Sequence, residues 1–384
     1  MTTGKPPKGV KDTAAPPRPE AAATLGVTAD IILPAVAVAL PSILIGDNWD
    51  EYNPGFGAHL RRDIYSARTA KLDPIALVCL PCGTLLYGGS FAVLVDGRWL
   101  SDQVHRDWQL AADGSFDEGG NGRPVIDVAT ETVLVARFGV ATWGHWLGEL
   151  LPRIVLAERC FPGRFSYTLP RSVFSQPEGT IWGAIRQSIA AYGIALDRCV
   201  PIDGGCNYRF RAAHAVTSVW SDRLMHPAAG LVMRQAICLP VPAPELLGGR
   251  MSLLRTETSS RQIANLAEIA GLLAGRGYKP VKIGLLPFLE QVGLFRAATS
   301  VVSVLGSGLT GLLYSPEGLA VASLAPDNFG DSFFYALAQN RRARYFDLRG
   351  PAVPGHEHMK HWNPFSISVA TLTEALDRLD ATGG

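Results

Sequence analysis

The sequence predicts an α/β protein that begins with short strands and continues with alternating helices and strands. Two observations carry this prediction. Short apolar runs separated by Pro, Gly, Asn and Asp occupy residues 29–98, and helical patterns alternate with apolar runs from Trp143 to the C-terminus. The chain has 384 residues, which is long enough for two domains with buried cores.

Composition excludes several classes of protein. Apolar residues make up 47% and charged residues 18% of the chain, as expected for a globule with a large core rather than a disordered charged chain. Lys and Arg number 35 against 34 Asp and Glu, so no excess of positive charge is present to hold a nucleic acid. We therefore expect no nucleic-acid partner.

The N-terminal residues 1–24 are rich in Pro, Ala, Lys and Thr, so we expect a disordered leader there. They do not resemble a secretory signal, and six cysteines are too few for a disulfide framework, which favours a cytoplasmic protein. The most apolar stretch, residues 31–45, contains Pro34 and Pro41 and is shorter than the roughly 20 residues that cross a bilayer. We expect buried strands here and no transmembrane segment, which leaves peripheral association with a membrane open.

The β-rich part precedes two helical patterns. Its expected strands are residues 32–40, 75–80, 84–89, 91–95 and 131–138, with a hairpin turn at Asp96-Gly97 and a loop at residues 113–123. The first helical pattern, residues 144–160, contains Pro152, which is expected to break or kink the helix after Glu149. The second is residues 177–194.

Three prolines and two adjacent glycines in residues 239–249 indicate a domain boundary. We therefore expect an N-terminal domain at residues 25–240, which is β-rich and then α/β, and a C-terminal domain at residues 241–384. The second domain is expected to hold strands at residues 250–255, 279–284, 300–306, 318–326 and 343–348, and helices at residues 261–277, 288–298, 331–342 and 368–380. This alternation predicts a doubly wound, Rossmann-like sheet.

A glycine-rich turn in the second domain is the most informative local feature. A strand runs into this turn and a helix follows it, so its backbone N–H groups and the positive helix end suit a phosphate group. Its residues are Gly306, Ser307, Gly308, Leu309 and Thr310. The alternative is a tight turn that only lets the helix pack against the sheet. The dinucleotide fingerprint is incomplete here, which disfavours a nicotinamide cofactor.

A histidine and a carboxylate are spaced for one helix face. His145, Glu149 and Arg153 follow one another at intervals of four residues, and a His supported by a carboxylate is a workable general base near neutral pH. The structural alternative is that His145 packs beside Trp143 and Trp146 while Glu149 and Arg153 form an ordinary ion pair.

Two arginines are expected at the edge of the second sheet. Arg255 ends a strand and Arg261 opens the next helix, so both lie where open α/β sheets bind ligands. Two guanidinium groups there could grip a diphosphate. A solvated surface pair is the alternative.

Metal binding is not expected. Cys79 and Cys82 form a CLPC motif without a second pair nearby, and strand-like residues flank it. His356, His358 and His361 have the composition of a metal site but lack a supporting Cys or Asp. We therefore expect neither a metal ion nor a bound cofactor.

Several of these segments resemble glycosyltransferase family 61. GHWLGELLPR, at residues 144–153, resembles the HWL-x-E/D-x-LPR segment of that family. Residues 255–269 and 287–318 are similar to its C-terminal pattern: an Arg-containing strand end, R-x-x-x-N, EQ-x-x-LF-x-x-A, a Gly-x-Gly-Leu-Thr turn and a P-x-G hairpin. The resemblance extends from about Glu131 to the end of the chain.

The resemblance implies a GT-B-type fold, in which two Rossmann-like domains face a cleft. It also implies an inverting, metal-independent transfer of a sugar from a nucleotide-sugar donor to a glycan or other hydroxyl acceptor. Short bacterial-type members are associated with capsule, lipopolysaccharide or exopolysaccharide assembly. His145, or failing it Glu149, would then be the base, and Arg153 and Asn265 would support the site. The donor diphosphate would be held by Arg255, Arg261 and the turn at residues 306–310.

The sequence departs from the family pattern around the expected donor pocket. Leu305 stands where His is common, Gly311 where Asn is usual, and Ser323 where Glu often ends the strand. These differences motivate a second hypothesis, a catalytically silent binding protein. A third is a nucleotide-sugar epimerase or hydrolase of similar fold.

Overall fold

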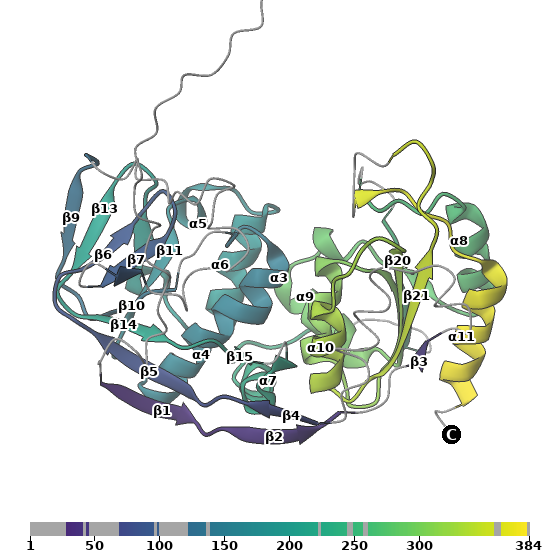
Figure 1. Ribbon diagram of the computed structural model, residues 1–384, viewed down its shortest axis with the longest axis horizontal. Coiled ribbons are helices and arrows are strands. Elements are labelled where there is room, and N and C mark those ends of the chain that lie inside the picture. The colour runs from purple at the N-terminus through teal and green to yellow at the C-terminus, as the bar shows by residue number, and fades with distance from the viewer. Residues whose placement is uncertain are drawn as a thin grey trace, which may run out of the picture.

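The computed structural model describes most of the chain from Thr28 to Ala381 (Figure 1). The described residues are 28–40, 44–45, 69–95, 98–99, 122–135, 139–221, 224–243, 249–255, 260–356 and 362–381. The expected leader, the Asp96-Gly97 turn and two of the three clustered histidines, His358 and His361, lie outside them.

The N-terminal half contains two stacked sheets. One has the strand order β1 (Ala29–Leu33), β5 (Ile75–Leu80), β14 (Ala213–Val216), β10 (Thr132–Val133), β11 (Ser166–Pro170) and β12 (Cys199–Ile202). The other has the order β8 (Arg98–Trp99), β7 (Ala92–Val95), β6 (Thr84–Tyr87), β13 (Asn207–Phe210) and β9 (Val125–Val128). Apolar side chains of both sheets, including Val78, Leu86 and Val93, form one buried cluster, as in a β-sandwich. The β-rich beginning is thus confirmed.

The first sheet changes from antiparallel to parallel along its width. β1, β5 and β14 pair antiparallel, whereas β14, β10, β11 and β12 pair parallel. Helices α4 (Leu151–Cys160), α5 (Ser172–Ser175) and α6 (Ile181–Ala191) cover the parallel part, and α7 (Pro227–Gln235) packs against α4 on the side of the C-terminal half (Figure 1). The mixed α/β class that the sequence predicts is therefore present in this half.

The helix does not break after Glu149, but its hydrogen bonding changes there from π-helical to α-helical. The chain is helical without interruption through α3 (Trp143–His145), the π-helical η5 (Trp146–Leu150) and α4. Proline cannot donate to the carbonyl four residues before it, and here the carbonyl of Gly148 accepts the indole N–H of Trp220 instead, at 2.7 Å. The wider π-turn and this substitute donor accommodate Pro152 within the helix.

The C-terminal half is built on a parallel six-stranded sheet. Its order is β18 (Lys279–Pro280), β17 (Arg250–Leu253), β19 (Ser300–Val304), β20 (Ala320–Pro326), β21 (Arg344–Gly350) and β3 (Leu44–Ile45). Its helices are α8 (Leu266–Gly275), α9 (Phe288–Ala297), the 3-10 helix η9 (Ser307–Tyr314), α10 (Phe333–Asn340) and α11 (Val369–Ala381). α8 and α11 cover the outer face and α9 and α10 the inner face, toward the N-terminal half (Figure 1). All five expected strands and all four expected helices are present, although β18 is shorter than expected. α8 begins at Leu266, so Arg261 precedes the helix that it was expected to open.

The N-terminal segment reaches both halves. β1 joins the first sheet, β2 (Val36–Ala39) pairs with β4 (Thr69–Leu72), and β3 adds an edge to the C-terminal sheet beside β21. These strands run along one side of the molecule (Figure 1). The expected division at residue 240 therefore differs from the structure at residues 44–45, which belong to the second sheet. A two-residue strand is too short for hydrophobic periodicity to assign it to either sheet.

One buried hydrophobic cluster spans the two halves. It includes Val155 and Ile185 from the first half and Phe288, Leu312 and Leu337 from the second. Such an extended apolar interface restricts relative motion of the halves.

Hydrogen bonds also cross this interface. The hydroxyl groups of Tyr192 and Tyr314 are 2.9 Å apart, and the side-chain oxygen of Gln187 accepts the backbone N–H of Phe288 at 3.0 Å. The contacts fix the orientation of α6 and of the segment that begins α9, because both partners of each bond are held by regular structure.

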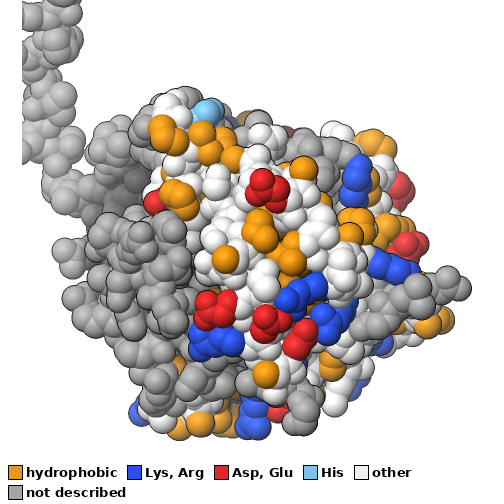
Figure 2. All heavy atoms as spheres, turned by 90° about the vertical axis from the view of Figure 1, so that its right-hand side faces the viewer, with side chains coloured by type: hydrophobic (Ala, Val, Ile, Leu, Met, Phe, Trp, Pro, Cys, Tyr) orange, Lys and Arg blue, Asp and Glu red, His pale blue; other side chains and the backbone are white. Residues whose placement is uncertain are grey.

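The surface over α8 and α11 carries both signs of charge (Figure 2). Arg250 pairs with Asp380 and Arg276 with Asp377. Among the described residues, no helix has the length and hydropathy that a membrane span needs.

Candidate active site

The carboxyl edge of the parallel sheet brings two arginines to one glycine. Arg255 follows β17, Gly306 follows β19, and the two strands are hydrogen-bonded neighbours. A Cβ added to Gly306 would lie within 3.0 Å of the Arg255 Nη2 atom and 3.3 Å from the Arg261 Nη2 atom. Both guanidinium groups therefore lie beside Gly306, and a side chain at this position would have to displace that of Arg255. The structure brings together the two arginines and the turn that the sequence predicted.

Arg261 is held in an unusual conformation. Its φ is +52°, in the left-handed region that non-glycine residues rarely adopt. Its backbone N–H donates to the carbonyl of Trp362 at 2.9 Å, and its guanidinium carbon lies 4.6 Å from the centre of the Phe329 ring and 5.9 Å from that of Trp362. Such strain, held in place by surrounding contacts, is frequent at ligand sites.

No carboxylate of the described residues is bonded to the guanidinium of Arg261. In the described part of the chain its buried Nε atom has no hydrogen-bond partner. Burial lowers the pKa of Arg261 to about 10, and the neighbouring charge of Arg255 acts in the same direction, while Asp331 opposes both. A bound anion would satisfy the free N–H group and offset the repulsion between the arginines.

Arg255 completes this cationic pair. Its Nη1 atom donates to the hydroxyl of Ser260 at 2.7 Å, and burial lowers the pKa of its guanidinium. Two partly buried cations side by side cost free energy unless an anion joins them. The solvated surface pair considered from the sequence is therefore not what the structure shows.

The glycine turn offers fewer N–H groups than the sequence suggests. The helix after Gly306 is a 3-10 helix, and the N–H of Leu309 already donates to the Gly306 carbonyl at 2.9 Å. Thr310 is buried, and its hydroxyl donates to the Ser307 carbonyl at 2.7 Å. The first N–H groups of a helix have no partner within it, so Ser307 and Gly308 are the positions that can face a ligand. Leu309 and Thr310 instead stabilise the turn.

His145 and Glu149 form a close pair. The Nδ1 atom of His145 is 2.5 Å from the Glu149 Oε1 atom, and the two side chains are 32% and 17% exposed. This contact orients the imidazole and directs the Nε2 atom away from Glu149. A Cβ added to Gly144 would lie 3.7 Å from the Thr310 hydroxyl, so the helix of His145 rests against the glycine turn's helix η9.

Asp331 is a polar residue of this region that sequence reasoning missed. It lies between β20 and α10, is half-buried, and its Oδ1 atom accepts the N–H of Phe333 at 2.8 Å. Burial raises the pKa of Asp331, although the charges of Arg349, Arg261 and His145 oppose this. The sequence shows an acidic residue between the end of one strand and the next helix, and this position was interpreted only as the first residue of the helix expected at residues 331–342.

Arg153 and Asn265, the two residues expected to support the site, are both held within the fold. Arg153 is 4% exposed on α4. Asn265 precedes α8, and its amide donates to the carbonyl of Ile367 at 2.8 Å and accepts the N–H of the same residue at 3.2 Å. Asn265 therefore ties the C-terminal segment to α8, and its amide points to that segment rather than to the arginine pair.

The departures from the family pattern have physical explanations in this fold. Leu305 is buried, at 1% exposure, and a Cβ on Gly311 would overlap the Phe295 ring. Ser323 donates to the Asp347 carboxylate at 3.2 Å. Asp347 in turn forms a buried bidentate ion pair with Arg349, with both N–O distances at 2.9 Å. The first two positions are thus core positions, and the third contacts a neutralised ion pair.

The described residues include no group of three His, Cys, Asp or Glu side chains placed to hold a metal ion. All six cysteines fall within these residues and are free thiols, including Cys79 and Cys82.

The chain was compared with family models, curated proteins and solved structures. No curated protein matches the chain. Among solved structures, the chain is similar to the bacterial iron-containing dodecameric glycosyltransferase TibC from enterotoxigenic E. coli H10407, with 15% identity, a TM-score of 0.34, and coverage of 80% of this chain and 94% of the other. The family model named Glycosyltransferase 61 matches residues 143–322, a range that includes His145, Glu149, both arginines and the glycine turn. Residues 143–322 of the chain are therefore similar to the glycosyltransferase 61 family, over a little less than half of its length.

Proposed function

We propose that the protein transfers a sugar from a nucleoside-diphosphate sugar to a hydroxyl acceptor, with inversion at the anomeric carbon. The observation that carries this proposal is the convergence of Arg255 and Arg261 on Gly306. Both guanidinium groups are partly buried, and Ser307 and Gly308 begin a helix beside them. Cations and helix N–H groups in this arrangement suit the two phosphates of such a donor.

The proposed reaction is a single displacement. The acceptor oxygen attacks the anomeric carbon, the bond from that carbon to the diphosphate oxygen breaks, and the acceptor proton passes to the Nε2 atom of His145. Glu149 stabilises the resulting imidazolium through the Nδ1 atom. The arginine pair stabilises the charge that develops on the leaving nucleoside diphosphate. These two positive side chains would supply what a divalent ion supplies elsewhere, so we propose a metal-independent reaction.

We further propose that the two halves correspond to the two domains of a GT-B enzyme. Parallel strands in both sheets support this, as does the origin of the base and the arginines in different halves. The buried cluster that joins the halves argues for limited closure. A polysaccharide-assembly role and the cytoplasmic location remain predictions from the sequence.

Isothermal titration with UDP and with GDP tests the proposal. We expect one of them to bind the full chain. We also expect the protein to hydrolyse the matching nucleotide-sugar or to transfer its sugar to an acceptor. Binding that persists unchanged in an Arg255→Ala, Arg261→Ala double variant would contradict the assignment of the diphosphate site. An absence of binding by both nucleotides would favour the silent binding protein.

A further inference from the structure

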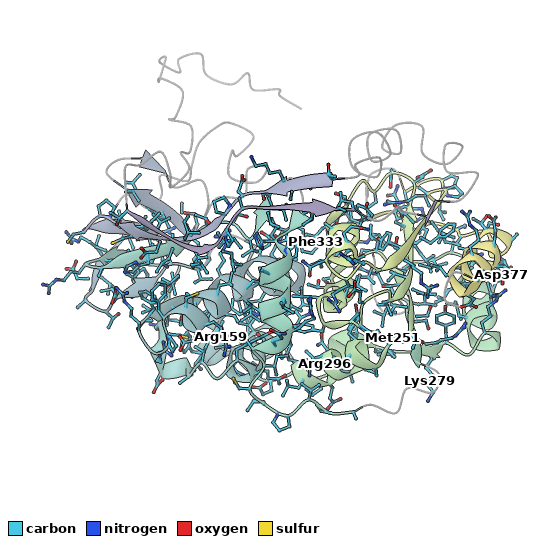
Figure 3. All side chains as sticks on the ribbon, turned by 90° about the horizontal axis from the view of Figure 1, so that it is seen from below. Arg159, Met251, Lys279, Arg296, Phe333 and Asp377 are labelled. Atoms are coloured by element: carbon cyan, nitrogen blue, oxygen red, sulfur yellow. The ribbon has the colours of Figure 1, made fainter. Side chains whose placement is uncertain are left out.

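Asp331 belongs to a segment that contacts both Arg261 and the helix of His145. Phe329, two residues earlier, packs under the Arg261 guanidinium. Phe333, two residues later, contacts the helix of His145, because its Cζ atom lies 2.6 Å from the position that a Gly148 Cβ would take. Figure 3 labels Phe333 where the N-terminal helices meet α10.

The segment that carries Asp331 is firmly anchored at both ends. On one side, Arg349 donates to the carbonyl of Phe329. On the other, the Phe333 ring stacks on Trp220 at 4.8 Å, and Trp220 donates to the Gly148 carbonyl. A carboxylate on such a segment keeps a defined position with respect to the proposed base and the proposed diphosphate site.

One oxygen of this carboxylate is available to a ligand. Oδ1 accepts the Phe333 N–H, and in the described part of the chain Asp331 forms no ion pair, so Oδ2 has no partner. The nearby Arg349 is already paired with Asp347 on two atoms. Asp331 as a residue is half-buried, so part of it remains accessible to solvent.

We propose that Asp331 binds a hydroxyl group of the donor sugar and thereby selects neutral sugars over uronates. This inference rests on the proposed function. The sugar of a bound donor must lie between its diphosphate, at Arg255 and Arg261, and the acceptor, at His145. Asp331 is a carboxylate on the segment that contacts Arg261 at one end and the helix of His145 at the other. A carboxylate accepts hydrogen bonds from hydroxyl groups and repels the negative charge of a sugar acid.

The raised pKa of Asp331 is consistent with hydrogen bonding to a sugar hydroxyl. Burial raises its pKa, so the ionised carboxylate is held at a cost that Phe333 and the nearby cations only partly offset. A hydroxyl donor would reduce that cost, because it would replace the water lost from Oδ2. Ionisable groups held in this way are concentrated at functional sites.

A comparison of neutral and acidic nucleotide-sugars distinguishes sugar binding by Asp331 from a role in which Asp331 only accepts the N–H of Phe333. Titrations would compare UDP with UDP-glucose and UDP-glucuronate, and GDP with GDP-mannose and GDP-mannuronate. We expect the neutral sugar to bind at least tenfold more tightly than its uronate in the wild-type protein. In Asp331→Asn we expect that preference to fall about tenfold, while the free nucleoside diphosphate binds as well as before or more tightly.

Asp203→Asn is the matched control. Asp203 Oδ1 accepts the N–H of Gly205 at 2.9 Å, the same two-residue turn that Asp331 forms, but Asp203 lies in the β-rich part next to Arg171. We expect this variant to keep the wild-type preference. Asparagine retains the capping oxygen at both positions, so a purely structural role would leave the preference unchanged.

The outcomes distinguish the two proposals. Failure of both UDP and GDP to bind overturns the proposed function and this inference with it. Normal nucleotide binding with no preference for neutral sugars, or with a preference that Asp331→Asn leaves intact, overturns only the role of Asp331. If Asp331→Asn keeps the preference for neutral sugars but abolishes turnover, Asp331 has a proton-transfer role, and its role in sugar binding is overturned.

Discussion

The guanidinium group of Arg255 occupies the space beside Gly306 where any other residue would carry its Cβ atom. The backbone of Gly306 is extended, with φ 166°, so the need for glycine is steric and not conformational. The glycine of the turn thus makes room for cations, in addition to allowing the chain to leave β19.

Gly306→Ala should therefore disturb the arginine pair directly. The new methyl group would meet Arg255 Nη2 within 3.0 Å and displace the side chain, so we expect nucleoside-diphosphate binding to weaken at least tenfold. Gly271→Ala is the control, because a Cβ on Gly271, inside α8, meets no atom within 4 Å. Calorimetry should show unchanged binding for that control and a gain in stability of up to about 1 kcal/mol. Equal binding by both variants would contradict the steric role of Gly306.

Arg255→Ala should reduce nucleoside-diphosphate binding by about 1.5 to 3 kcal/mol, the usual contribution of a hydrogen bond to a charged group. Arg255→Lys should recover part of this loss, because it restores the charge but not the planar donor fork. The dissociation constants of the three proteins provide the measurement. An affinity that none of these changes alters would remove Arg255 from the site.

Binding should also depend on pH through Arg261. Its pKa in the free protein is about 10, and a bound anion raises that pKa, because it favours the protonated form. Affinity should therefore stay level below about pH 9 and fall as pH rises through 10, where the free protein loses this charge. The nucleotide itself can titrate in this range, so Arg261→Gln serves as the reference: it should bind more weakly and lack the part of the decrease that belongs to Arg261. Parallel curves for the two proteins would contradict the prediction.

His145→Ala should lower turnover by about 10² to 10⁴-fold, the usual contribution of a general base, and leave nucleotide affinity nearly unchanged. Glu149→Gln should have a smaller effect if Glu149 only orients the imidazole, and a larger one if its carboxylate takes the proton. Melting temperatures of the nucleotide-free variants are the control. A large loss of stability with preserved turnover per folded molecule would show that His145 is a packing residue.

Chelation should not abolish transfer. The proposed leaving-group stabilisation comes from Arg255 and Arg261, so EDTA should leave the initial rate within about twofold of its starting value. Loss of activity on EDTA treatment with recovery on addition of Mn²⁺ or Mg²⁺ would contradict the metal-independent mechanism.

The sequence predicted the second half well because its elements have strong local patterns. β19, η9 and β20 follow from an apolar strand, a glycine turn and a second apolar strand, and the edge that collects Arg255 and Gly306 follows from parallel order. Asp331 was missed because its importance depends on Arg261 and on the helix of His145, which are far from it in sequence. The break that Pro152 suggested does not occur, because its accommodation depends on a donor from Trp220, which is distant in sequence.

The insertion of β3 beside β21 has a consequence for biosynthesis. Leu44 and Ile45 leave the ribosome before every other strand of their sheet, whereas their partners Phe346 and Asp347 are made near the end of translation. This edge of the sheet can close only when almost the whole polypeptide has emerged, and contacts so distant in sequence form slowly. A fragment that begins at β17 would carry β21 with an open edge, which is a template for pairing with other chains and hence for aggregation.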